Sequence, residues 1–84
     1  MHFVYILQSK IRKTFYIGYC TDVEKRLEQH NSGYTKSTKR YKPWVVIYTE
    51  SYNSLHEAAK REWHLKHPAG YLEKRAILEQ YSVE

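Results

Sequence analysis

The chain has 84 residues, with 14 Lys and Arg against nine Asp and Glu, and a formal charge of +5. A chain of this length forms one domain with one modest core, which excludes a two-domain enzyme. The excess of positive charge favours nucleic acid as a partner, although many small proteins are equally basic for solubility alone.

Cysteine count and hydropathy set further limits. The single Cys20 excludes an internal disulfide and a zinc site made of several cysteines, as expected in a reducing compartment. No stretch approaches the roughly 20 apolar residues that span a bilayer, and the apolar segment Met1–Leu7 is too short for a signal peptide. We therefore predict one cytoplasmic domain over residues 1–84, with no membrane partner.

Two strands are predicted at the start of the chain. Phe3–Leu7 is an unbroken apolar run whose β-branched and aromatic residues favour a buried strand. Thr14–Cys20 is a second such run, and a polar, basic loop separates the two, which predicts a hairpin. Gly18 lies inside the second run, where a glycine often marks the close approach of another backbone or a ligand.

A helix and a basic loop come next. Thr21 and Glu24 fit a capping box that opens a helix from Asp22 to about His30. Residues 33–43 show neither a helical nor a strand period and predict an irregular loop. The loop is rich in aromatic and basic side chains, which include Tyr34, Lys36, Lys39, Arg40 and Lys42.

The second half of the chain predicts one more strand and two helices. Trp44–Tyr48 resumes β character, and Ser54 and Glu57 fit a capping box for a helix that must end near Pro68. A last helix is predicted over about 70–81. The order ββαβαα predicts an α/β domain with a small three-stranded antiparallel sheet flanked by helices.

Two polar residues lie on or beside the apolar face of the first predicted helix. At about 100° per residue, Val23, Leu27 and His30 share a stripe, and Arg26 lies at its edge, one turn before His30. Arg26 and His30 thus face the same way. From spacing alone, Arg26 could equally be a charge at the rim of the core, and His30 could complement the helix dipole.

Glu62 is the strongest anomaly of the second predicted helix. It falls on the same face as Leu55, Ala58, Ala59 and Lys66, near the middle of the stripe that should pack inward. A carboxylate there needs a partner. Lys66 one turn later would serve, and so would a divalent cation such as Mg²⁺, which prefers oxygen ligands.

Tyr5 and Tyr16 each lie in the middle of a predicted strand. In an antiparallel hairpin two such residues can meet on one face of the sheet. Core packing explains most tyrosines in such positions. A phenol with a pKa near 10 acts as a general base only if a nearby cation lowers that pKa.

Together these motifs resemble the GIY-YIG nuclease domain. The resemblance covers residues 3–66 and rests on Phe3–Tyr5, Tyr16–Gly18, the Arg26–His30 stretch (Arg-Leu-x-x-His) and Arg61–Trp63, in this order and spacing. Within that superfamily the chain is most similar to small stand-alone bacterial members. It is more distantly similar to the excision-repair nuclease subunit and to homing endonucleases.

The resemblance implies a DNA endonuclease that hydrolyses phosphodiester bonds with Mg²⁺ or Mn²⁺, in DNA repair or recombination, without a small-molecule cofactor. By its motifs, Tyr5 and Tyr16 line the active site and Arg26 binds the scissile phosphate. His30 assists proton transfer, and Glu62 is the metal ligand. We expect DNA contacts at Gly18 and in the basic loop, from Tyr34, Lys36, Lys39, Arg40 and Lys42.

The sequence departs from the family pattern at three places. Phe3 replaces the first glycine, Tyr19 stands where several relatives carry a lysine, and no Asn follows Glu62. A second hypothesis is therefore a catalytically weak or inactive nucleic-acid-binding module of the same fold. A third is an interaction domain in which the tyrosines and Glu62 only pack and pair.

Overall fold

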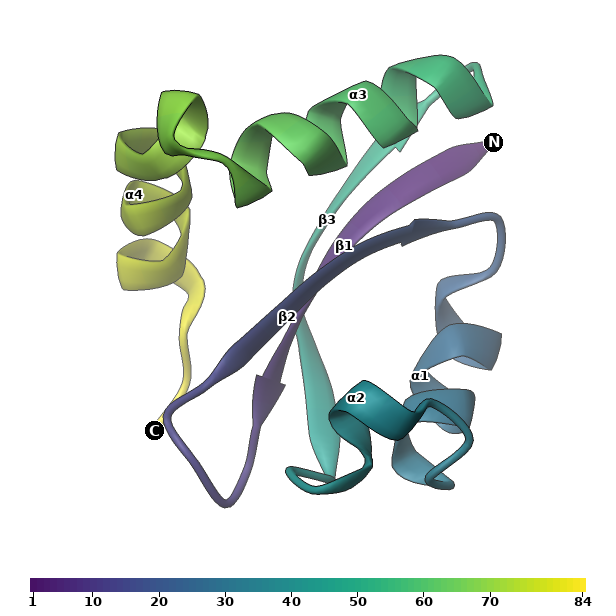
Figure 1. Ribbon diagram of the computed structural model, residues 1–84, viewed down its shortest axis with the longest axis vertical. Coiled ribbons are helices and arrows are strands. Elements are labelled where there is room, and N and C mark those ends of the chain that lie inside the picture. The colour runs from purple at the N-terminus through teal and green to yellow at the C-terminus, as the bar shows by residue number, and fades with distance from the viewer.

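The computed structural model describes all residues from 1 to 84. It confirms the predicted α/β fold, in which a three-stranded antiparallel sheet is flanked by helices in the order ββαβαα, and it adds one short helix, α2 (Figure 1). No helix is long and apolar enough to cross a membrane. In chain order the elements are β1 (His2–Ser9), β2 (Phe15–Cys20), α1 (Val23–Asn31), α2 (Lys36–Lys39), β3 (Trp44–Tyr52), α3 (Leu55–Lys66), the 3₁₀ turn η1 (Pro68–Gly70) and α4 (Tyr71–Tyr81).

β1 is the central strand, because the sheet order is β2-β1-β3 and both pairings are antiparallel. Helices α3 and α4 lie on one side of the sheet and α1 and α2 on the other (Figure 1). Val4 and Ile6 belong to one buried cluster, and Tyr5 and Leu7 belong to another. Both faces of β1 are therefore covered, which explains why its sequence is apolar from Phe3 to Leu7 rather than alternating.

The core is divided by the sheet into two apolar clusters. Burial of apolar side chains on both sides stabilises the stack of helix, sheet and helix. The cluster on the α3 and α4 side contains Val4, Ile6, Ile17, Ala58 and Leu65. The cluster on the α1 side contains Tyr5, Leu7 and Trp44, with Val23 and Leu27 of α1 packed against it. The predicted inward stripe of α1 is thus confirmed.

One of the two predicted capping boxes is wrong. Asp22, not Thr21, is the N-cap of α1, and its Oδ1 accepts a hydrogen bond from the Lys25 backbone N–H at 3.0 Å. An aspartate at this position both accepts the bond and complements the helix dipole. Ser54 is confirmed as the N-cap of α3, because its Oγ accepts from the Glu57 N–H at 3.1 Å.

Two further boundaries differ from the predictions. β3 runs to Tyr52 instead of Tyr48, because the whole length of β1 offers a partner, with His2 opposite Tyr52. The segment predicted as an irregular loop contains α2, a helix of only four residues. So short a helix has no periodicity that a sequence can show.

The inward face of α3 is also rotated from the one predicted. Ala58 and Leu65 are fully buried, whereas Leu55 is 54% exposed at the start of the helix. The face is centred on Leu65, so Glu62 moves from the predicted middle to the edge, and Lys66 lies beyond it, exposed. The Glu62 side chain is 18% exposed and remains accessible.

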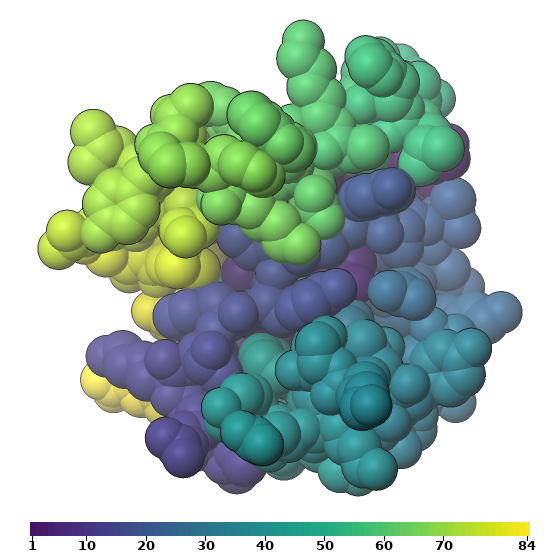
Figure 2. All heavy atoms as spheres, viewed as in Figure 1, coloured from purple at the N-terminus to yellow at the C-terminus, as the bar shows by residue number.

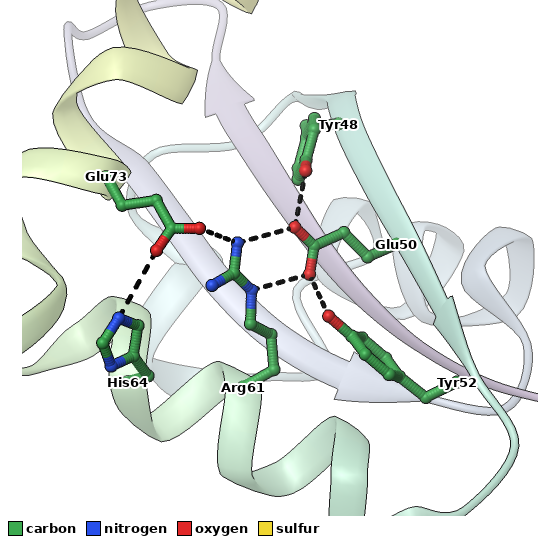
Figure 3. Close-up of polar contacts among 6 residues, drawn as sticks. All are labelled: Tyr48, Glu50, Tyr52, Arg61, His64 and Glu73. Carbon is green, nitrogen blue, oxygen red and sulfur yellow. Dashed lines mark hydrogen bonds and ion pairs between the residues drawn. The ribbon is translucent and has the colours of Figure 1, made fainter.

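A polar network ties α3 and α4 to β3 (Figure 3). Arg61 of α3 donates two hydrogen bonds to the Glu50 carboxylate, at 2.8 and 2.9 Å, and a third to Glu73 of α4. The hydroxyls of Tyr48 and Tyr52 donate to the same Glu50 carboxylate at 2.5 and 2.6 Å. The acid of β3 is therefore fully hydrogen-bonded, and both helices are held through Arg61.

This network predicts an acid-dependent loss of stability. Burial raises the Glu50 pKa, but hydrogen bonds from Arg61, Tyr48 and Tyr52 outweigh it and lower the pKa from 4.5 to about 2. A carboxyl whose folded pKa is lowered stabilises the fold above its unfolded pKa, and that stability is lost as pH falls. We expect the free energy of unfolding to fall between about pH 4.5 and about pH 2.

Urea unfolding at several pH values, beside a Glu50→Gln variant, measures this effect. The amide of the variant does not titrate, so its stability should depend less on pH across that window. Identical pH dependence in the two proteins would show that Glu50 contributes nothing to acid sensitivity.

Candidate active site

An open hollow of about 450 Å³ lies at the edge formed by β2, between α1 and α3. In Figure 2 it is seen where the purple atoms of β1 show behind the blue atoms of β2. Four of the five residues predicted to carry chemistry line it, and His30 does not. The lining residues are Tyr5, Tyr16, Gly18, Tyr19, Cys20, Thr21, Arg26 and Glu62.

Gly18 makes room for the side chain of Tyr5. The two residues are opposite each other in the β1–β2 register. A Cβ atom on Gly18 would lie 2.6 Å from the Tyr5 hydroxyl and 2.8 Å from its Cζ, closer than such atoms approach. The glycine predicted to mark a close approach therefore admits the Tyr5 phenol, which reaches the hollow across the strand.

Tyr5 begins a chain of buried hydrogen bonds. Its hydroxyl lies 3.0 Å from His30 Nε2, and His30 Nδ1 lies 2.7 Å from Thr38 Oγ1. Thr38 Oγ1 donates to the Thr35 carbonyl at 3.3 Å. Because the Thr38 hydroxyl donates its proton to Thr35, it can only accept a hydrogen bond from His30. Nδ1 of His30 therefore carries the imidazole proton, and Nε2 accepts from the Tyr5 hydroxyl.

Burial sets the protonation of this chain. Burial lowers the pKa of His30, and the neighbouring Arg26 cation lowers it further, so the imidazole is neutral at neutral pH. The dipole-complementing role considered for His30 therefore does not hold. Burial also raises the Tyr5 pKa to about 12, with Arg26 opposing the shift only in part. The protein alone does not supply the lowered pKa that a tyrosine base requires.

Arg26 has an unsatisfied donor within the protein. Its Nη1 donates to Gln29 at 3.1 Å, and the neighbouring Tyr5 hydroxyl raises the Arg26 pKa, but the buried Nε has no partner with hydrogen-bond geometry. Such orphaned donors are rare in folded proteins. The guanidinium lines the hollow, so an anion placed there would satisfy it with a charge-assisted bond. The alternative of a simple rim charge does not account for the buried Nε.

Glu62 supplies the only carboxylate in the hollow. Its Oε2 lies 3.2 Å from Lys66 Nζ, and the same ammonium lies 5.5 Å from the centre of the Tyr16 ring. Both partners considered for Glu62 are thus compatible with the structure. No group of three or more His, Cys, Asp or Glu side chains in the chain is placed to hold a metal ion. One carboxylate suits Mg²⁺, which usually keeps several waters and takes further ligands from substrate phosphates.

Comparison with known proteins gives the family. Residues 1–75 match the family model described as the GIY-YIG catalytic domain. The chain belongs to the GIY-YIG family. It is 42% identical over 66 residues to a UPF0213 protein of Staphylococcus haemolyticus, which covers 77% of this chain and 79% of that protein. It is 40% identical over 67 residues to one of Halobacterium salinarum, covering 79% and 86%.

A solved relative of this GIY-YIG chain has the same architecture. The solution NMR structure of a UPF0213 protein from Bacillus halodurans superposes with a TM-score of 0.56 at 32% sequence identity. The match covers 96% of this chain and 86% of that one. Family membership suggests a nuclease with a divalent metal and a nucleic-acid substrate.

The basic surface of this GIY-YIG domain lies outside the hollow. The predicted DNA-contacting residues of the 33–43 segment are exposed, and none of them lines the hollow. Figure 2 shows α2, in teal, on the same face of the molecule as β2 and α3. The exposed side chains are Tyr34, Lys36, Lys39, Arg40 and Lys42.

Thr38 is the site-supporting residue that the sequence did not reveal. It is 1% exposed, and its backbone carbonyl also accepts a hydrogen bond from the Trp44 indole at 2.9 Å. It lies among exposed basic residues in a segment without periodicity, so no local pattern sets it apart. Its contact with His30 depends on how α2 folds back onto α1.

Proposed function

We propose that this GIY-YIG protein is a metal-dependent endonuclease that hydrolyses phosphodiester bonds in DNA. The observation that carries the proposal is the convergence of Tyr5, Tyr16, Arg26 and Glu62 on one hollow. These residues come from two strands and two helices. Tyr5 is fully buried behind Gly18, and a structural role in packing does not require all four to line one hollow.

Arg26 and Glu62 would handle the charge of the phosphate. Arg26 would bind a non-bridging oxygen through the guanidinium that lines the hollow, and its fixed charge would oppose the negative charge that develops in the transition state. Glu62 would hold the divalent cation. When bound, such a cation polarises the phosphate and stabilises the leaving 3′ oxygen.

Tyr5 and His30 would handle the proton of the attacking water. As water attacks phosphorus, its proton would pass to the Tyr5 oxygen while the Tyr5 proton passes to His30 Nε2, 3.0 Å away. The P–O3′ bond breaks, and the leaving oxygen takes a proton from solvent. This relay avoids a free tyrosinate, which matters because the Tyr5 pKa is raised to about 12. Thr38 would keep Nε2 unprotonated.

The exposed basic residues near α2 would contact phosphates on either side of the cut. Such contacts position a duplex without reading its sequence. The positively charged residues of this surface are Lys36, Lys39, Arg40 and Lys42.

Plasmid nicking tests the proposed function. Purified protein should convert supercoiled plasmid to the nicked form in Mg²⁺ or Mn²⁺, and EDTA should abolish the reaction. Plasmid that stays supercoiled with either metal, while DNA binding persists, would favour the non-catalytic binding module instead. The observation that favours this second function is the ion pair between Glu62 and Lys66, because it satisfies the carboxylate without a metal ion.

A further inference from the structure

Trp63 is an exposed aromatic residue whose ring stacks on a neighbouring side chain. Its side chain on α3 is 55% exposed, whereas the only other tryptophan, Trp44, is 3% exposed. The Trp63 ring stacks on His67, with ring centres 3.9 Å apart and planes 16° apart. An indole held flat at the surface contributes little to the core, so its position calls for another explanation.

His67 holds this stack in place. Its Nδ1 lies 2.6 Å from the Trp63 carbonyl, and its backbone N–H donates to the His64 carbonyl at 3.3 Å. The imidazole therefore covers one face of the indole from a fixed position at the end of α3. No other aromatic ring or cation stacks on Trp63.

The stack lies on the outer face of α3, beyond the residues of that helix that border the candidate active site. Successive helical residues are rotated by about 100°, so a path outward from buried Leu65 meets Glu62, then Lys66, then Trp63. Lys66 pairs with Glu62 and lies over Tyr16, both of which line the hollow. A DNA strand that leaves the hollow across α3 would meet the Lys66 ammonium and then the indole.

We propose that Trp63, backed by His67, is a stacking platform for an unpaired nucleobase of a DNA strand that leaves the candidate active site across α3. The inference rests on the proposed nuclease function, and it adds a substrate class, namely DNA with an unpaired segment. Bases inside a duplex are covered on both faces by their neighbours, so only an unpaired or terminal base can lie on the indole. Base–aromatic stacking accepts any base and is strengthened by adjacent positive charge, here Lys66.

Fluorescence titration in EDTA tests the platform without cleavage. A single-stranded oligothymidylate should quench Trp63, while an abasic oligomer of the same length and charge should not. Because Trp44 is buried, the change in emission reports mainly on Trp63. We expect Trp63→Ala to weaken single-strand binding about tenfold and Trp63→Phe to retain most of it.

Two controls separate stacking from other effects. Leu72→Ala removes an even more exposed apolar side chain from α4, 79% exposed against 55% for Trp63, and should leave binding unchanged. Relaxed, covalently closed circular duplex, which has no terminal base, should bind wild type and Trp63→Ala alike. Equal single-strand affinity of wild type and Trp63→Ala, or equal quenching by the abasic oligomer, would overturn the platform. A Trp63→Ala variant that loses self-association but binds DNA as the wild type does would also overturn the platform.

Failure of the stacking platform can be told apart from failure of the proposed nuclease function. A protein that nicks plasmid but shows no base-dependent quenching retains its catalytic proposal and loses the platform. A protein that shows base-dependent quenching but nicks nothing with either metal keeps the platform as a binding site and loses the endonuclease.

Discussion

Glu62→Gln should lower the rate of plasmid nicking in Mg²⁺ by at least about 100-fold, an effect typical of lost transition-state charge stabilisation. The amide keeps the size of the side chain but loses the anionic oxygen that a hard divalent cation prefers. Because Glu62 is the only carboxylate in the hollow, no neighbour can replace it. Raising the metal concentration should restore part of the rate.

The fold should survive this change. Glu62 has one ion-pair partner, Lys66, at the helix edge, and such i,i+4 pairs are worth about 0.3–0.5 kcal/mol. Glu57→Gln on the same helix is the matched control, because Glu57 is exposed and outside the hollow. Nicking by Glu62→Gln at the rate of Glu57→Gln would remove Glu62 from the mechanism.

Arg26→Lys should lower nicking by about 10²–10³-fold, although the positive charge remains. Lysine has no equivalent of the buried Nε, and its point charge does not match the fork with which a guanidinium binds phosphate. Single-turnover nicking at saturating protein measures this effect on the chemical step. Affinity for DNA in EDTA should change much less, because most phosphate contacts lie elsewhere.

Stability separates this effect from a folding defect. The Arg26 Nε has no partner in the protein, so its removal leaves no new donor unsatisfied. We expect the thermal midpoint to stay level or rise slightly. Arg75→Lys, in the exposed pair with Glu79 on α4, is the matched control. A substantially lowered midpoint for Arg26→Lys alone would mean that Arg26 serves the fold.

The sequence predicts those parts of the fold that depend on local patterns. The apolar run of β1 identifies a strand buried on both faces, and Ser54 identifies the start of α3. Gly18 signals a close approach, which proves to be that of the Tyr5 phenol. These predictions succeed because strand burial, helix capping and the small size of glycine each depend on a few neighbouring residues.

Features that depend on tertiary contacts could not be predicted from the sequence. The face of α3 is set by Leu65 packing on the sheet, and counting from Leu55 places Glu62 too deep. The contact of Thr38 with His30 exists only because α2 packs against α1. The roles of Tyr5, Tyr16, Arg26, His30 and Glu62 in catalysis stay predictions that the structure makes geometrically reasonable.

One measurement tests the central claim most directly: a time course of labelled-DNA cleavage in Mg²⁺ by five preparations purified in the same way. These are the wild type, Glu62→Gln, Arg26→Lys and the two control variants, Glu57→Gln and Arg75→Lys. We predict cleavage that rises with protein concentration for the wild type and both controls, and almost none for the two site variants. Equal cleavage by all five, as a contaminating nuclease would give, or no cleavage by any of them, would contradict the account.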